Sequence, residues 1–211
     1  MAQGTDNWGT YHISSDLQNY ETARSNYFTF VVSDFSKFSK LLRAGADVAT
    51  AGDSDYINAS QAQEYLKLSV DKATVPHFSL GVVTIRRQNS VSKFAGLPEF
   101  GEGSIVVRDF IGLDTKSILM AWQALGYDVV SDKGGRAGDW TDSAGVKHIG
   151  YKQNCELIEY TADHEEIRRW RLIGCWISAI TEDDFDAEAG DTARQITATF
   201  QYDRAIMVMP K

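Results

Sequence analysis

The residue types that most often do chemistry are scattered along this sequence. It has four histidines, namely His12, His77, His148 and His164. They show no metal-ligand spacing such as H-x-x-x-H, so we expect surface or structural roles for them. Cys155 and Cys175 are too few for a zinc site without further ligands, and they lie in adjacent strand candidates. We interpret both as buried apolar residues.

Two other stretches resemble ligand-binding loops at first sight. The segment TEDDFDAEAGD carries six carboxylates, at positions Glu182, Asp183, Asp184, Asp186, Glu188 and Asp191. It lacks the regular oxygen spacing and the glycine of a calcium loop, which favours a solvated turn. DKGGRAGD is rich in glycine but lacks the GK[ST] ending of a phosphate-binding loop, and there is no G-x-S-x-G elbow. The sequence therefore predicts no catalytic, cofactor or metal site and a protein that is not an enzyme.

Composition sets further bounds. The chain has 211 residues, of which 43% are hydrophobic and 24% charged, enough for a real core. A formal net charge of −8 argues against sequence-independent binding of nucleic acid, which needs many Lys and Arg residues. No apolar run approaches the roughly 20 residues of a membrane helix. The first residues, MAQGTDNWGTYHISSD, do not read as a signal peptide, so we expect synthesis in a cytoplasm.

The elements that would position any site are mostly strands, with one clear helix. That helix lies within 109–130 and presents Ile118, Leu119, Trp122 and Leu125 as one apolar face, which predicts packing against a sheet. Asp114 is the expected N-cap, and Gly126 is expected to end the helix in a left-handed conformation.

Alternating or β-branched runs predict about seven strands. The expected strands span residues 26–34, 64–78, 80–87, 104–111, 151–161, 167–180 and 194–208. SKFAGLPEFGEG reads as a turn. The strand over 167–180 is apolar on both faces, which predicts burial on both sides, by its own domain or by a neighbouring subunit. The fold class is therefore mostly β: two packed antiparallel sheets, in a sandwich or barrel, with one flanking α-helix.

The remaining segments divide the chain simply. Residues 1–25 are polar and predict an N-terminal arm, and residues 26–211 predict a single β-domain. Long loops are expected over 36–63 and 131–150, the latter with five glycines among twenty residues. A loop that long in a compact domain is usually functional or ordered by a partner.

The order of these motifs resembles that of bacteriophage tail tube proteins, in particular those of contractile tails and the similar inner tube of type VI secretion. The resemblance runs from about Asn26 to the end of the chain. Its features, in order, are KFAGLPEFGEG, a strand ending in RDFIG, the helix DTKSILMAWQALGYD, a Gly-rich loop, CELIEYT, RRWRLIGCWISAI, an acidic turn and FQYDRA.

The resemblance implies a tail-tube fold and a structural virion protein without cofactors. Six copies would close into a ring, and stacked rings would form the tube that conducts phage DNA into the host cell without binding it specifically. Sheath, tape-measure and baseplate proteins would be partners, and the location would be the virion tail. Loop residues Asp47, Asp53, Asp55 and Tyr56 are expected between rings. Thr197, Thr199 and Gln201, on the polar face of the last strand, are expected to line the lumen.

Two alternatives stay open. The tube could belong to a type VI or other contractile injection system, which differs from a phage tail in cargo. It is also open whether the tail contracts. A β-sandwich that binds carbohydrate would need exposed aromatic residues on one face, and Trp8 and Trp140 lie in loops where they could serve.

Overall fold

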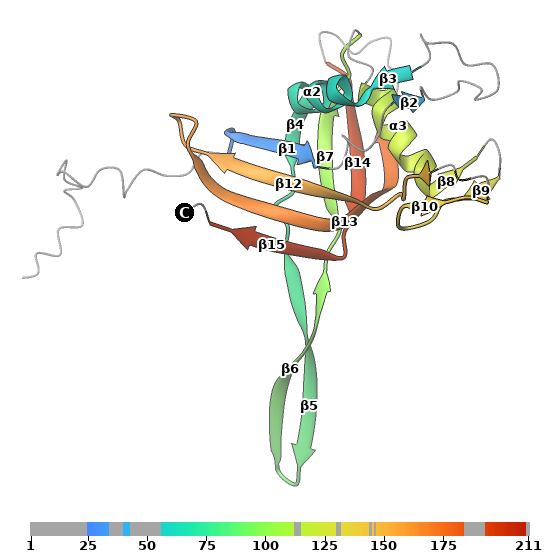
Figure 1. Ribbon diagram of the computed structural model, residues 1–211. Helices are drawn as coiled ribbons and strands as arrows, with labels where there is room; N and C mark the ends of the chain where they lie inside the picture. The colour runs from blue at the N-terminus through green and yellow to red at the C-terminus, as the bar shows by residue number, and fades with distance from the viewer. Residues whose placement is uncertain are drawn as a thin grey trace, which may run out of the picture.

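The computed structural model of the protein (Figure 1) describes residues 25–33, 40–42, 56–111, 115–129, 132–143, 145, 147–183 and 193–209. Its elements, in chain order, are β1 (Phe28–Val32), β2 (Lys40–Leu42), β3 (Tyr56–Asn58), α2 (Ala59–Ser69), β4 (Val70–Ala73), β5 (Phe78–Arg87), β6 (Ser90–Phe100), β7 (Gly103–Arg108), α3 (Thr115–Gly126), β8 (Tyr127–Asp128), β9 (Lys133–Gly134), β10 (Trp140–Thr141), β11 (Lys147–His148), β12 (Gln153–Tyr160), β13 (Glu166–Glu182), β14 (Gln195–Gln201) and β15 (Arg204–Val208). The predicted arm over 1–25 lies almost wholly outside the described residues.

The predicted mostly β, antiparallel fold is confirmed. Seven strands form one sheet in the order β1-β12-β13-β14-β7-β4, and β15 also pairs with β13. β13 is 17 residues long and belongs to both halves of this sheet. Its first part pairs with β12 and β15, and its second part pairs with β14. The described strands do not close into a barrel, because β1 and β4 end the path.

β13 changes partners at Gly174. This residue has φ +71°, a left-handed conformation that favours glycine. A side chain at Gly174 would also collide with the Asp203 carboxylate, since an added Cβ would lie 2.3 Å from its Oδ2. The Asp203 backbone N–H donates to the Ile173 carbonyl at 2.9 Å, and the Asp203 carboxylate forms an ion pair with Lys152 at 2.7 Å. The turn at Asp203 and the bend in β13 therefore hold each other in place.

This turn corrects one prediction. A single strand was expected over 194–208, but β14 ends at Gln201 and β15 begins at Arg204. Because β13 bends, β14 and β15 pair with different parts of it and cannot be one straight strand. The alternation of polar and apolar residues runs past the end of β14 as far as Asp203, so it does not mark where the strand ends.

The core lies between the two halves of the bent sheet and against the two helices, and Phe30 of β1 and Phe200 of β14, strands that do not pair, have ring centroids 5.7 Å apart across it. Phe30, Val107, Leu172 and Ile196 are among the residues whose side chains are essentially inaccessible. Helix α3 packs against β13, and α2 packs against β1 and α3. In α3, Ile118 and Leu119 are fully buried, Trp122 is 2% exposed, and Leu125 is partly buried against the core. The Trp122 indole also donates to the Tyr151 carbonyl at 3.2 Å, which satisfies its one polar atom.

Helix α2 contradicts two expectations. Its residues were assigned to a long loop, up to 63, and to a half-buried strand from 64. The segment ASQAQEYLKLS is instead helical, and its buried side chains Ala62, Leu66 and Ser69 recur at helical spacing. The alternation of apolar and polar residues over 64–70 also fits a β-strand, in which side chains repeat every two residues. Packing of the segment against the rest of the fold favours the helix. The strand itself is confined to β4.

The stretch SKFAGLPEFGEG was predicted as a turn, and this is also wrong. Ser92–Phe100 lies in β6, which pairs along its length with β5. The pairing shifts register at Gly81, where Gly96 approaches so closely that an added Cβ would lie 2.9 Å from the Gly81 carbonyl oxygen. Glycines here permit close approach of two strands rather than a turn.

The ends of α3 also differ from expectation. Gly126 is the last helical residue and is not among the described glycines with positive φ. Its carbonyl accepts a hydrogen bond from the Gly135 N–H at 2.8 Å, so β8 follows without a left-handed cap. Asp114 lies outside the described residues. None of the helices in the described part of the chain is long and apolar enough to cross a membrane.

Replacement of Trp122 by alanine tests the role of α3 in the core. We expect Trp122→Ala to lower the free energy of unfolding by about 3–5 kcal/mol, because the indole is fully buried. Met120 is on the same helix but is 39% exposed, so Met120→Ala should cost much less. Urea unfolding followed by circular dichroism measures both, and equal losses would contradict this account.

Candidate assembly surfaces

The residues that could ligate a metal are not clustered in the described part of the chain. Within this part of the chain, no group of three or more His, Cys, Asp or Glu side chains could hold a metal ion. Cys155 and Cys175 are both free and buried, on the neighbouring strands β12 and β13. The exposed surfaces of the described residues are considered next.

Trp140 does not form a flat platform for a sugar. The His148 ring stacks on the indole with a centroid distance of 4.2 Å and an interplanar angle of 14°. The Arg136 guanidinium lies over the same indole, 4.3 Å from the centroid. Two groups this close cannot share one face, so both faces of the indole are covered. Trp8, the other residue considered for carbohydrate binding, lies outside the described residues.

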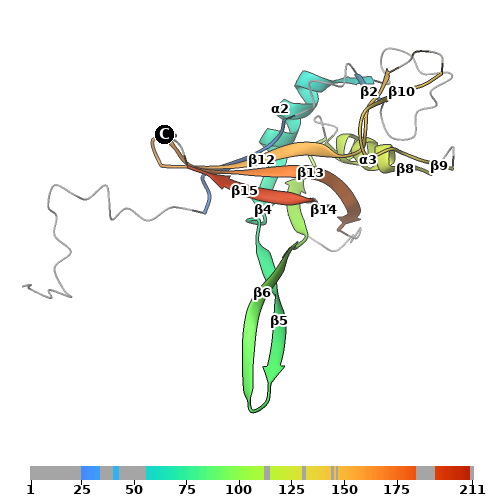
Figure 2. The same ribbon diagram turned by 60° about the horizontal axis from the view of Figure 1, so that its bottom comes forward.

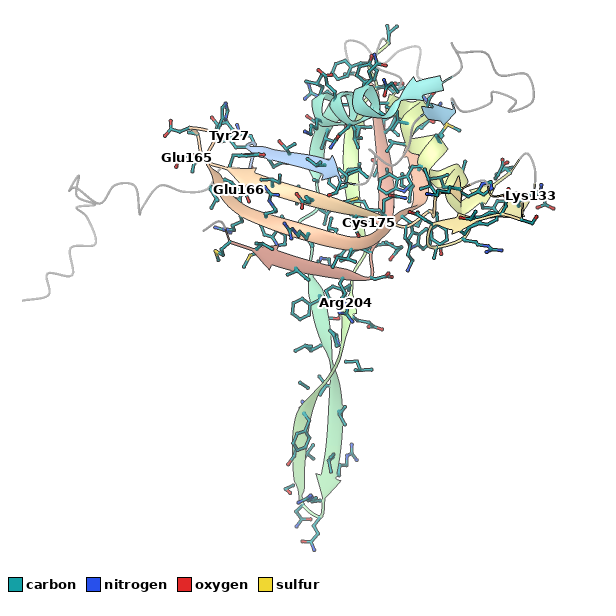
Figure 3. All side chains as sticks on the ribbon, in the orientation of Figure 1. Tyr27, Lys133, Glu165, Glu166, Cys175 and Arg204 are labelled. Atoms are coloured by element: carbon teal, nitrogen blue, oxygen red, sulfur yellow. The ribbon has the colours of Figure 1, made fainter. Side chains whose placement is uncertain are left out.

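The largest uncovered feature is the hairpin formed by β5 and β6. It projects from the sheet as a two-stranded arm, which two views show standing clear of the body (Figures 1 and 2). Side chains along it extend into open space on both sides (Figure 3). Leu97 is 86% exposed, Val82 66% and Phe94 54%. We call residues Phe78–Phe100 the arm.

The base of the arm is fixed to the core. Phe78 and Phe100 contact each other with ring centroids 5.7 Å apart, and Phe100 lies 6.1 Å from the Tyr202 ring. The Tyr202 hydroxyl donates to the His77 carbonyl at 3.2 Å, and burial raises the pKa of this hydroxyl. Beyond this anchor the arm is held by the pairing of β5 with β6, and an isolated two-stranded hairpin is marginal in water. An exposed apolar arm of this kind marks an interaction site.

Edges of the main sheet are also uncovered. Among the described strands, β1 pairs only with β12, and β15 pairs only with β13. At β15 the apolar residues Ile206 and Met207 are 48% and 50% exposed. Unpaired strand edges present free N–H and C=O groups, which readily pair with another chain. The prediction that the strand over 167–180 is buried on both sides does not hold within one chain, since Ile173 is 40% exposed and Trp176 half-buried.

The sheet face that points away from the core is polar along β14. Thr197, Thr199 and Gln201, the residues predicted to line a lumen, alternate with the buried Ile196, Ala198 and Phe200. They therefore share one half-buried face, and Thr197 and Thr199 lie beside Val106 and Ser104 of β7. The loop residues Asp47, Asp53 and Asp55 lie outside the described residues. Tyr56 is the first residue of β3 and pairs with Leu42 of β2.

On the first half of the sheet, charges on this face compensate one another. Arg169 contacts Glu156 at 2.8 Å and Glu166 at 2.7 Å, and Arg171 contacts Glu156 at 3.2 Å. The hydrogen bonds donated by Arg169 hold the pKa of Glu166 below its usual value. Glu165 and Glu166 lie at the end of the sheet near Tyr27, as Figure 3 shows.

Comparisons with known proteins identify the fold. No protein-family model and no curated protein matches the sequence. A chain from the extended-state sheath–tube complex of PVC, an extracellular contractile injection system, has a TM-score of 0.58 at 14% identity, and the match covers 94% of this chain and 100% of that chain. A chain from the tube-terminating cap of the anti-feeding prophage also has a TM-score of 0.58, at 11% identity, over 100% of both chains. A chain from the PVC sheath/tube terminator has a TM-score of 0.55 at 16% identity, over 89% and 97%.

At these identities the likeness is one of fold. The fold predicted from the resemblance, that of tube components of contractile systems, is confirmed. The similar structures are parts of injection particles, not enzymes. Sequence reasoning missed the arm, although the sequence carries a signal for it, since two runs with apolar residues are joined by the short polar segment QNS. In the structure these runs pair, with Val82, Val83 and Ile85 opposite Ala95, Phe94 and Ser92.

The exposed apolar residues of the arm should matter for association and not for folding. We expect the triple variant Val83→Ser, Ile85→Ser, Phe94→Ser to change the free energy of unfolding by no more than about 0.5 kcal/mol for each substitution, as for surface positions. Its self-association, measured by analytical ultracentrifugation, should fall. Val129→Ser, at a position that is 82% exposed outside the arm, is the matched control. Normal association of the triple variant would exclude the arm as an assembly surface.

Acid should weaken the end of the sheet that lies opposite the arm. There, Glu182 lies 2.7 Å from Lys116 and also contacts Arg194. The hydrogen bond from Lys116 lowers the pKa of Glu182, with Arg194 acting in the same direction. A carboxyl with a lowered folded pKa contributes stability above its unfolded pKa of about 4.3, and this is lost as pH falls through the folded pKa.

We therefore expect Glu182→Gln to cost at most about 1 kcal/mol at pH 7, since the pair is partly exposed. Below the unfolded pKa the variant should approach the wild type in stability. Urea unfolding at pH 7 and at pH 3 measures the difference, with the exposed Glu64→Gln as control. A cost that is equal at both pH values would contradict the ion-pair explanation.

Proposed function

We propose that this protein is the tube subunit of a phage-tail-like contractile machine, and that its copies form closed rings which stack into a hollow tube. The observation that carries the proposal is the extent of the fold likeness, which reaches 94–100% of this chain and 100% of the matched chains from tube-containing injection particles. A domain with an added, unrelated activity would leave part of its length unmatched.

The uncovered surfaces support assembly from identical copies. The arm and the free edges of β1 and β15 are different surfaces, so contacts made through them are heterologous. Heterologous contacts close into rings or continue as stacks, and the two kinds of surface on this chain suffice for both. Six copies per ring is part of the proposal, as the resemblance implies.

The lumen is proposed to be lined by the polar sheet face that includes Thr197, Thr199 and Gln201. Hydroxyl and amide groups at these positions offer passing cargo no cationic site, and the net charge of −8 disfavours adhesion of DNA. DNA passing from a phage head to the host cell is the first candidate cargo. The location would then be the virion tail, with sheath, tape-measure and baseplate proteins as partners.

A second candidate function is the inner tube of a contractile injection system that delivers protein. It is favoured by the similar structures, which come from extracellular contractile injection systems and the anti-feeding prophage. Both candidates share the tube and differ in what passes through it. Residues 1–25 and the loop with Asp47, Asp53, Asp55 and Tyr56 are proposed to contact the neighbouring ring in either case.

Imaging of the purified protein tests the tube. Negative-stain electron microscopy and two-dimensional averaging at high protein concentration should show six-fold rings or hollow tubes. Small-angle scattering should show particles larger than one chain. A compact monomer in both measurements, also in the presence of a co-expressed baseplate initiator, would exclude the tube proposal. A closed ring with another symmetry would correct only the number of copies.

A further inference from the structure

A cavity lies at the end of the sheet where β1 begins. It has a volume of about 300 Å³ and is lined by Asn26, Tyr27, Phe28, Thr29, Tyr160 and His164. These residues come from the start of β1, the end of β12 and the turn that joins β12 to β13. Four of the six carry aromatic rings. The faces of such rings attract cations, so the lining favours a positively charged group.

The two tyrosines of the cavity lie side by side. The Tyr160 N–H donates to the Tyr27 carbonyl at 2.9 Å, and the next pair along these strands is Phe28 opposite Glu159. Tyr27 and Tyr160 are therefore opposite residues of an antiparallel pair, whose side chains share one face with Cβ atoms about 4.5–5.5 Å apart. The His164 ring meets the Tyr27 ring edge-on, with centroids 6.5 Å apart and an interplanar angle of 82°. The three rings thus border the cavity on adjoining sides.

The turn between β12 and β13 holds the His164 ring in this position. Thr161 closes the turn twice, since its N–H donates to the Glu165 carbonyl at 2.8 Å and its hydroxyl accepts from the Glu165 N–H at 3.1 Å. The His164 N–H donates to the Thr161 carbonyl at 3.1 Å, and His164 has φ +65°. Residues other than glycine rarely adopt this left-handed conformation. The hydrogen bonds of the turn therefore stabilise an unfavourable backbone conformation that brings the imidazole to Tyr27.

Carboxylates outnumber cations around the cavity. Residues 159–169 carry four carboxylates and two arginines, a net charge of −2 with histidine neutral. Both arginines already contact carboxylates, since Arg168 lies 3.8 Å from Glu159 and Arg169 lies 2.7 Å from Glu166. Neither arginine is therefore an uncompensated positive charge that would repel a cation from the cavity.

Two carboxylates of the turn are available to such a cation. Asp163 and Glu165 flank His164 in sequence, and both are exposed. Neither forms an ion pair with another residue in the part of the chain that the structure describes. Figure 3 shows Glu165 at the same end of the sheet as Tyr27. The cavity thus combines aromatic rings with nearby carboxylates.

We propose that this cavity binds the guanidinium group of an arginine side chain. A guanidinium is planar, stacks on aromatic rings and donates two parallel hydrogen bonds to a carboxylate. Tyr27 and Tyr160 supply the rings, and Asp163 and Glu165 supply the carboxylates. An anion would be repelled by the net charge of the surroundings, and a neutral sugar would gain nothing from it. The inference does not depend on the proposed tube function, because one chain supplies the whole cavity.

Saturation-transfer NMR with N-acetyl-arginine amide tests the inference. This method observes the probe, so it applies to the free subunit and to an assembled particle alike. We expect saturable transfer from the protein to this probe and none to N-acetyl-citrulline amide, which carries a neutral urea group of the same shape. The signal should weaken as sodium chloride is added, because salt screens exposed charges.

Variants of the tyrosines locate the binding. Tyr27→Leu and Tyr160→Leu should each weaken binding of the arginine probe about threefold to fivefold, as expected for loss of one cation–π contact. The matched control is Tyr127→Leu, since Tyr127 is 51% exposed and contacts the Asp132 carboxylate outside the cavity. Circular dichroism verifies that all three variants fold.

Variants of the turn test the contribution of charge. The double variant Asp163→Asn, Glu165→Gln should weaken binding of the arginine probe about twofold or more, as for an exposed ion pair. Glu64→Gln, Glu99→Gln makes the same charge change at two exposed positions outside the turn and is the control. Equal binding of the arginine and citrulline probes would overturn the inference. Wild-type affinity in both Tyr27→Leu and Tyr160→Leu would overturn it as well.

The source of the arginine is a separate arm of the experiment. Analytical ultracentrifugation measures self-association of the wild type with and without saturating N-acetyl-arginine amide. Weaker self-association with the probe would assign the arginine to a second copy of this chain. Unchanged self-association together with saturable binding would assign it to a different protein. Both results support a guanidinium site, whereas absence of saturable binding to the folded wild type overturns the inference and leaves the tube proposal untouched.

Discussion

The bend in β13 is the constraint on which the rest of the structure depends. One strand serves two halves of the sheet only because Gly174 adopts a left-handed conformation at the point where the partners change. The Asp203 turn fills the space that a side chain at Gly174 would need. This turn in turn starts β15, whose free edge and exposed apolar residues are available to another chain. A local backbone feature thus decides which strands end the sheet.

The residues that stabilise the folded monomer differ from those on the surfaces proposed for association. Helices α2 and α3 bury one face, with Ile118, Leu119 and Trp122 at the centre, and this supplies the core that a monomer needs. The arm stands clear of the described body (Figure 1), and the outward face of β14 is only half-buried. Changes in the core should therefore act on stability, and changes on the arm should act on assembly. Tyr202 connects the arm to the core, since its ring contacts Phe100 at the base of the arm and the residue itself belongs to the core.

Sequence patterns predicted those parts of the fold in which one periodicity dominates. The helix with Trp122, the strands β12 and β13 and the alternation of Thr197, Thr199 and Gln201 with apolar residues are of this kind. Helix α2 was missed because its short alternating stretch fits a strand as well, and burial of Ala62 and Leu66 decides between them. The arm was missed because Gly96 and Pro98 suggest a turn, whereas β6 is exposed and pairs only with β5, so such residues are tolerated. The site is a surface, and a surface has no sequence motif comparable to that of a catalytic centre.

The exposed apolar arm proposed for assembly also endangers a free subunit, because exposed apolar strands aggregate. Two features of this chain limit that risk. The arm carries the cations Arg86, Arg87 and Lys93 against the single carboxylate Glu99, a net charge of +2, so two arms repel each other and side-by-side pairing of arms is disfavoured. The acidic bodies repel one another as well, which leaves contact between an arm and a body as the favoured approach. Under the proposed function, this distribution of charge would favour contacts between an arm and a body over symmetric contacts between two arms or two bodies.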